Sequence, residues 1–275
     1  MALKKQALAG HVAAYVRRES SIAECLSVGA VDSAACNLKE AVMGADLVVL
    51  CTPIGQMTSL LKQMCGSLSK GALITDVGSV KRAVVTPLER LARKAGAEFV
   101  GSHPMAGSEK TGVKAAKADL FQGAICVVTP TRKTSQGALE RIEALWRSIG
   151  SQVLRMSPGE HDRLVSRCSH LPHLLAAQLT HLVLDPSLPE DQQRLCANGF
   201  RDVTRIASGS PEMWRDIALA NGDYLCEAAE QFTKRLRSIC RAIRKGDGER
   251  LMVFYQEAKS RRDAWALRPR ISSPE

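Results

Sequence analysis

The first half of the chain alternates short apolar runs with helix-like segments, and this pattern restricts the possible folds more than any other feature. The segments with helical spacing of apolar residues are 22–29, 57–68, 81–96 and 138–150. The apolar runs have strand length and are rich in β-branched residues; they occupy 11–16, 45–52, 71–77, 97–102, 123–129 and 151–156. Nearly continuous apolar strands separated by helices are typical of a parallel sheet with helices on both faces. The sequence therefore predicts an α/β domain over residues 1–156.

The strand pattern stops near residue 157, and helical patterns fill the remainder of the chain. They are predicted over 160–184, 190–206, 211–244 and 247–267. The longest has no proline after Pro211, and its apolar residues recur at helical spacing. A long amphipathic helix buries its apolar face on another element, often in a second subunit. We therefore expect an all-helical domain over 157–275 that forms a homodimer.

Composition excludes several classes of protein. No apolar run approaches the roughly 20 residues that a membrane helix needs, and the N-terminal sequence lacks the apolar centre of a signal peptide. The nine cysteines form no CxxC pair, which indicates reduced thiols and a cytoplasmic location.

The net charge of +10 is concentrated in the first domain. Residues 1–156 carry 20 Lys and Arg against 12 Asp and Glu, whereas residues 157–275 carry 18 against 16. A basic domain suits nucleic acid or small anions such as a dinucleotide and a carboxylate. Aromatic residues are only 4% of the chain, and no helix-turn-helix, zinc-finger or RNP-like sequence is present, so we expect small anions rather than nucleic acid.

The predicted strands end in small or turn-forming residues, at Thr52–Pro53, 76–79 and 101–104. In open α/β sheets, ligands bind at the carboxyl ends of the strands. Two other stretches are rich in residues that carry chemistry: 168–178 holds two histidines three residues apart, and 199–217 is dense in arginine.

Together these stretches resemble the prephenate/arogenate dehydrogenase family of tyrosine biosynthesis. The resemblance covers the chain from Met1 to about Trp265, and several motifs occur in the same order. They are CTPIG (51–55), TDVGSVK (75–81), HPMAGSEKTGV (103–113), SHLPH (169–173) and the TRI…MW spacing (204–214).

The resemblance implies a Rossmann-like domain, a helical dimerisation domain and oxidation of prephenate or arogenate by NAD(P)+ with loss of carbon dioxide. His103 would accept the proton of the ring hydroxyl, and Ser79 would contact that hydroxyl or the nicotinamide. Arg205 would bind a substrate carboxylate, for which guanidinium is a bidentate partner. His173 and Trp214 match family positions that line the side-chain end of the substrate. The residues that match a polar cluster controlling access to the pocket are Glu109, Asp162, Arg201 and Asp202.

Structural roles compete with these assignments. Ser79 would equally cap a helix that begins at Val80, and Trp214 would by default pack in a core. Arg201 would serve as a surface ion-pair residue. Zinc binding by Cys168, His170 and His173 is disfavoured because Pro172 separates the histidines and no fourth ligand is evident; His170 instead would buttress a helix start.

The cofactor preference is predicted from the end of the strand 11–16. Val16 stands where an NAD-binding site usually has an acid, and Arg17, Arg18 and Ser20 follow. They suit the 2′-phosphate of NADP, although Glu19 opposes this and the arginines would otherwise be simply solvated. We expect Thr52, Pro53 and Ser79 to complete the cofactor site, with NADP favoured slightly over NAD.

The sequence begins with what resembles the second half of the first Rossmann helix, without the preceding strand and GxGxxG turn. We expect translation to begin upstream. The alternatives are a 6-phosphogluconate or β-hydroxyacid dehydrogenase, for which no catalytic lysine is evident in the helical part, a catalytically inactive paralogue, or a basic nucleic-acid-binding protein.

Overall fold

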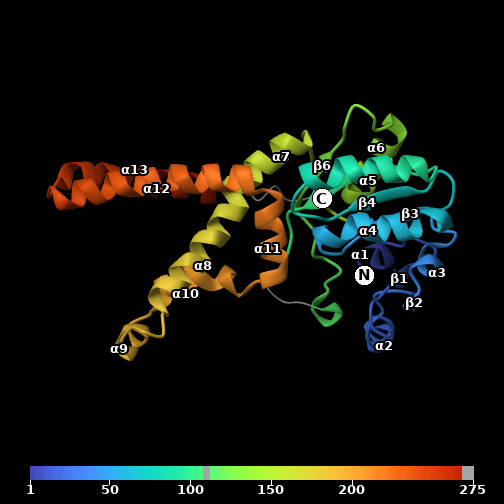
Figure 1. Ribbon diagram of the computed structural model, residues 1–275, viewed down its shortest axis with the longest axis horizontal. Coiled ribbons are helices and arrows are strands. Elements are labelled where there is room, and N and C mark those ends of the chain that lie inside the picture. Colours follow the sequence, from blue (N-terminus) through green and yellow to red (C-terminus); the bar gives the residue numbers. More distant parts are fainter. Residues whose placement is uncertain (108–111, 268–275) are drawn as a thin grey trace.

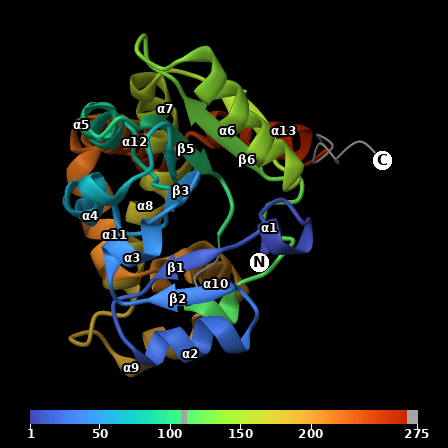
Figure 2. The same cartoon turned by 90° about the vertical axis from the view of Figure 1, so that its right-hand side faces the viewer.

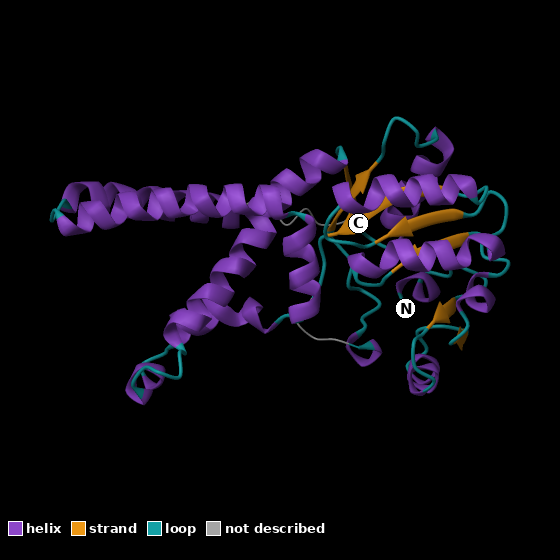
Figure 3. Cartoon of the chain, viewed as in Figure 1, coloured by secondary structure: helices purple, strands orange, loops and turns teal. Residues whose placement is uncertain are grey.

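The computed structural model describes residues 1–107 and 112–267. Its strands gather on one side of the molecule, and the helices that follow residue 157 form the other side (Figure 3). In the described part of the chain, no strand follows residue 157, which confirms the predicted division between an α/β region and a helical region.

The seven strands of the described residues form two sheets, a finding that corrects the expectation of one continuous sheet. A small parallel sheet pairs β1 with β2, which lie apart from the other strands (Figure 2). The larger sheet has the order β3-β4-β5-β6-β7. The strands are β1 (Ala13–Tyr15), β2 (Ser33–Ala35), β3 (Leu47–Leu50), β4 (Leu73–Asp76), β5 (Glu98–Pro104), β6 (Ile125–Thr129) and β7 (Gln152–Arg155).

The larger sheet is mixed rather than wholly parallel, because β5 and β6 pair antiparallel. Parallel neighbours need a long crossover connection, usually a helix, and no α-helix separates β5 from β6 in the described residues. The pairs β3–β4, β4–β5 and β6–β7 are parallel as expected.

The strand β2 was not predicted. Its residues, Ser33, Ala34 and Ala35, are small and have low strand propensity, so only pairing with β1 defines them as a strand.

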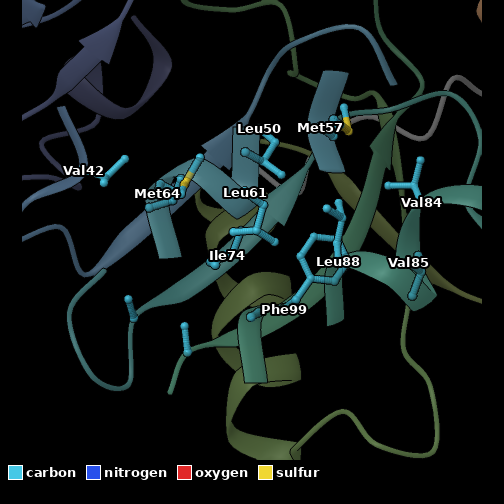
Figure 4. Close-up of a cluster of buried hydrophobic side chains, with 14 residues drawn as sticks. Val42, Leu50, Met57, Leu61, Met64, Ile74, Val84, Val85, Leu88 and Phe99 are labelled. Atoms are coloured by element: carbon cyan, nitrogen blue, oxygen red, sulfur yellow. The ribbon is translucent and has the colours of Figure 1, made fainter. Parts of the chain in front are cut away.

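Helices cover both faces of the larger sheet (Figure 1). Leu61 and Leu88 pack with Ile74 and Phe99 on one face (Figure 4), whereas Trp146 packs on the other. The helices of this region are α1 (Ala2–Lys5), α2 (Ser20–Ser27), α3 (Leu38–Val42), α4 (Ile54–Met64), α5 (Arg82–Lys94) and α6 (Gln136–Ser148). Alternate residues of a strand point to opposite faces, so each buried strand serves two cores.

The remaining helices are short except for the last two, which lie side by side and extend away from the sheet (Figure 1). They are α7 (Pro158–Val165), α8 (Leu171–Val183), α9 (Glu190–Arg194), α10 (Asn198–Thr204), α11 (Pro211–Ala220), α12 (Gly222–Arg244) and α13 (Gly248–Ala266). A π-helical turn, Ser166–His170, joins α7 to α8, and a 3₁₀ turn, Arg205–Ser208, follows α10.

The predicted single helix over 211–244 was wrong, because Asn221 divides it into α11 and α12. The Asn221 backbone leaves helical geometry at φ −118° and ψ 26°, and its side chain is buried against α7 and the π-helical turn. Ser210 caps the start of α11 by accepting a hydrogen bond from the Met213 amide at 3.3 Å.

Candidate active site

The centre of the candidate site is His103, which lies within β5 rather than in the loop after it. The strand is two residues longer than expected because His103 and Pro104 pair with Val127 and Cys126 of β6. The ring is buried, and its Nδ1 lies 2.8 Å from Nε2 of His161 on α7. Burial, the nearby Lys81 ammonium and His161 together hold the pKa of His103 well below its usual 6.5, so the imidazole is neutral at pH 7.

His161 is held in turn by Asp162. The His161 Nδ1 lies 2.7 Å from Asp162 Oδ1, and both side chains are fully buried. The Asp162 carboxylate also accepts hydrogen bonds from the backbone amides of Lys81 and Arg82, each at 2.8 Å. It therefore caps the first turn of α5, where the helix dipole favours negative charge.

This capping contact corrects the structural role considered for Ser79. The helix begins at Arg82 rather than Val80, and its capping oxygens come from Asp162. Ser79 instead lies in the loop between β4 and α5, and its backbone faces the His170 ring.

A buried ion pair lies beneath the same loop. The Lys81 ammonium donates to the Asp76 carboxylate and to the Ser102 carbonyl, and both charged side chains are fully buried. Burial lowers the pKa of Lys81, while Asp76 opposes that shift. The pair places a positive charge beside His103 and disfavours the imidazolium form.

A second group of predicted residues assembles on the helical side. The His173 ring on α8 stacks on Trp214 of α11, with ring centroids 3.6 Å apart. Gly209 makes room for this ring, since a Cβ there would lie 2.6 Å from Trp214 Nε1. Arg205 is close enough to His173 to lower its pKa, although burial is the larger cause.

His170 connects the two groups. Its ring faces Trp214 edge-on at a centroid distance of 6.2 Å, and it is one of the groups near His103 that lower the pKa of that residue. Its Nδ1 lies 3.1 Å from the Asn221 amide nitrogen, which donates to the Asp162 carbonyl at 2.9 Å. Burial lowers the pKa of His170 to about 4.

Buried polar atoms without a hydrogen-bond partner concentrate around these residues. Among the described residues they are Thr52 Oγ1, His170 Nε2, His173 Nδ1 and Trp214 Nε1. Buried polar atoms normally have partners, so such a concentration is typical of a ligand site.

The residues predicted for the cofactor divide between the two sheets. Thr52 and Pro53 follow β3 and lead into α4, where Gly55 allows close approach of α11; a Cβ there would lie 3.0 Å from Asp216 Oδ2. Arg17 and Arg18 follow β1 in the small sheet and are exposed, and Ser20 begins α2.

The predicted polar cluster is not assembled as expected. Asp162 bonds to His161 and the start of α5, whereas Arg201 and Asp202 are exposed on α10. Glu109 lies outside the described residues. Arg201 and Arg205 instead share a cavity of about 440 Å³, whose other lining residues are Cys196, Ala197, Phe200, Thr204 and Ser208.

Sequence reasoning missed His161, Lys81 and Asn221. The adjacent His161 and Asp162 at the start of a helix were a usable signal, because a carboxylate commonly orients a functional histidine. Nothing local indicated that they lie against His103, which is 58 residues away in the chain.

Within the described ranges, no helix combines the length and apolar character of a membrane span. The same residues contain no group of three or more His, Cys, Asp or Glu side chains suited to a metal ion.

Fold and site together define a protein with a sheet region and a helical region that meet at a histidine-lined site. Two family models match the chain: the prephenate dehydrogenase nucleotide-binding domain over residues 1–155 and the prephenate dehydrogenase dimerization domain over residues 157–257. The chain belongs to the prephenate dehydrogenase family.

Individual relatives agree with this assignment. The chain is 38% identical to a prephenate dehydrogenase of Bacillus subtilis, over 90% of this chain and 67% of that protein. It is 34% identical to a cyclohexadienyl dehydrogenase of Zymomonas mobilis, over 87% of this chain and 81% of that protein. The crystal structure of Aquifex aeolicus prephenate dehydrogenase with hydroxyphenyl propionate and NAD+ superimposes with a TM-score of 0.89 at 33% identity, covering 96% of this chain and 92% of that one.

Proposed function

We propose that the chain catalyses the oxidative decarboxylation of prephenate or arogenate. In this reaction the ring C4 loses a hydride, the ring carboxylate leaves as carbon dioxide, and the ring becomes aromatic. The observation that carries the proposal is the neutral, buried His103 near His170, together with the contacts of Trp214 with His170 and His173, whose ring nitrogens include buried atoms without hydrogen-bond partners.

The protein residues have separate tasks. His103 accepts the proton of the C4 hydroxyl, because a neutral imidazole is a base at pH 7. Arg205 holds a carboxylate of the substrate, and the stacked His173 and Trp214 line the side-chain end. Ser79 contacts the hydroxyl or the cofactor.

The residues present fit a nicotinamide cofactor at the carboxyl ends of β3 and β4. The buried Thr52 Oγ1 lacks a partner there, and Pro53 and Ser79 flank the same edge of the sheet. When bound, the nicotinamide supplies the hydride acceptor. Arg17, Arg18 and Ser20 would hold the ribose end, and their charge favours the 2′-phosphate of NADP.

Activity assays with prephenate and arogenate test the function. We expect His103→Asn to lower kcat by about 10²-fold or more with little change in substrate affinity, because a general base is lost. Arg205→Gln should instead mainly raise KM, because a carboxylate anchor is removed. Near-normal turnover by His103→Asn would refute the assignment.

Kinetics with both nucleotides test the cofactor preference. We expect NADP to serve at least as well as NAD, and Arg17→Ala to weaken NADP selectively, since it removes a charge beside the 2′-phosphate. A clear NAD preference that Arg17→Ala leaves unchanged would show that the arginines are only solvated.

The lysines argue against the β-hydroxyacid dehydrogenase alternative, whose catalytic lysine lies on the helical domain. Between residues 157 and 267 the lysines are Lys234, Lys245 and Lys259, and all three are exposed. The buried Lys81 belongs to the sheet domain and is paired with Asp76.

We further propose a homodimer formed by the helical domain, with the domain boundary between Met156 and Ser157. Ser157 caps α7 by accepting from the Glu160 amide, which supports a boundary just before that helix. The nine cysteines are all unpaired thiols, which supports a reducing, cytoplasmic environment.

A further inference from the structure

Three buried side chains form a line of hydrogen bonds that leads away from the reacting end of His103. His103 Nδ1 lies 2.8 Å from His161 Nε2, and His161 Nδ1 lies 2.7 Å from Asp162 Oδ1. We propose that His161 and Asp162 are positioning residues that fix the tautomer of His103, so that its Nε2 carries the lone pair offered to the substrate hydroxyl. This inference rests on the proposed role of His103 as the base.

The argument begins at Asp162, whose two oxygens both act as acceptors. Oδ1 accepts from the Lys81 amide and Oδ2 from the Arg82 amide, each at 2.8 Å. A carboxylate at a helix N-terminus is stabilised in its ionised form, which can only accept hydrogen bonds. His161 Nδ1 must therefore donate its hydrogen to Oδ1.

The hydrogen on His161 Nδ1 determines where the other hydrogens of this hydrogen-bond line lie. A His161 ring that carries its single hydrogen on Nδ1, donated to Asp162, has no hydrogen on Nε2. Its Nε2 is then an acceptor, and the only hydrogen available to the 2.8 Å contact is on His103 Nδ1. A neutral His103 with hydrogen on Nδ1 has a bare Nε2, the form that a general base requires.

The same line stabilises the base after it has reacted. When the hydroxyl O–H bond breaks and the Nε2–H bond forms, His103 becomes a cation and its Nδ1–H donates more strongly to His161. The charged or titratable groups that face His103 are Lys81, His161 and His170, with Asp76 paired to Lys81 and Asp162 to His161. Asp162 is the carboxylate that compensates the new charge through His161.

The tautomer can be measured directly on the full chain without substrate. Nitrogen-15 NMR of the histidine-labelled protein at pH 7 distinguishes protonated from bare ring nitrogens, and His103→Asn identifies the His103 signals. We expect a protonated Nδ1 and a bare Nε2. A proton on Nε2 would overturn the proposal.

Asp162→Asn tests the origin of the effect. The amide oxygen can still accept from the Arg82 amide, but an NH₂ group in the place of Oδ1 loses the Lys81 capping bond, faces His161 Nδ1 and reverses both tautomers. By analogy with loss of the orienting aspartate in a Ser-His-Asp triad, we expect kcat to fall by about 10³-fold or more, with substrate KM changed less than about threefold. The NMR signals of His103 should switch to a protonated Nε2.

His161 variants separate orientation from packing, and they remain informative if Asp162→Asn fails to fold. His161→Gln offers an amide oxygen to His103 Nδ1 and should keep kcat within about tenfold, whereas His161→Leu should lose about 10²-fold or more. His181→Gln, at an exposed histidine of α8, is the matched control and should match the parent. Equal losses in folded Gln and Leu variants would refute the positioning role.

The experiments also separate this inference from the proposed function. If the chain oxidises neither substrate but NMR shows the expected tautomer, the proposed function fails and the positioning role stands. If the chain is active and His103 carries its proton on Nε2, the proposed function stands and the positioning role fails.

Discussion

At the scale of single residues, the site depends on imidazoles that burial keeps neutral. His103 and His170 have strongly lowered pKa values, and in both cases desolvation is the largest cause. Lys81 adds to the effect at His103, and the Asp76 carboxylate keeps that buried ammonium paired. The same burial that makes His103 a base at pH 7 makes the folded protein sensitive to acid.

We expect these histidines to leave the free energy of unfolding unchanged above about pH 6.5. As the pH falls toward 4 the free energy of unfolding should decrease, because the histidines bind protons in the unfolded chain but stay neutral in the folded chain. For His170, the difference between 6.5 and about 4 corresponds to about 3 kcal/mol at pH 4. Urea unfolding of the parent and His170→Gln at several pH values measures this. The variant should show a shallower decrease, and the exposed His181→Gln should not; identical curves for the parent and His170→Gln would contradict the account.

At the scale of elements, the helical region is tied to the sheet by polar contacts at helix ends. Asp162 of α7 caps α5, and Asn221 at the junction of α11 and α12 bonds to the Asp162 carbonyl. Gly55 permits the close approach of α4 and α11. These contacts bring His103 from one domain to within reach of the histidines of the other.

Asn221→Ala tests this junction. The substitution leaves the buried His170 Nδ1 without its Asn221 partner and removes one of the two hydrogen bonds to the Asp162 carbonyl, which also accepts from the Ser166 amide. We therefore expect a loss of about 1–3 kcal/mol in unfolding free energy. Asn198→Ala, at an exposed asparagine of α10, is the matched control and should change stability by less than about 0.5 kcal/mol. Equal stability of the two variants would show that the junction is held by apolar packing alone.

At the scale of the whole molecule, the paired helices α12 and α13 extend away from the remainder of the chain (Figure 1). Several apolar side chains that the helical pattern expects to be buried are exposed there: Leu236 is 51% exposed, Ile243 57% and Met252 59%. Exposed apolar surface of this extent marks an interaction site, and in this family the region is the dimerization domain.

We expect the protein to be a dimer at micromolar concentration. The double variant Leu236→Glu/Ile243→Glu should be monomeric, because it would bury charges in the interface. Lys234→Glu, at an exposed polar position of α12, should remain dimeric. Light scattering measures the oligomeric state of the parent and of both variants, and a monomeric parent protein would refute the proposal.

Local patterns in the sequence determined the fold class and supplied candidate residues for the site. Strand and helix periods depend on neighbouring residues, so the six predicted strands and the helical second half were recovered, and the motifs identified His103, His173, Arg205 and Trp214 as candidates. Only the tertiary structure decided the antiparallel pairing of β6, the break at Asn221 and the contact of His161 with His103. Each of these depends on groups far apart in the chain, which leave no periodic signal because their partners are chosen by packing.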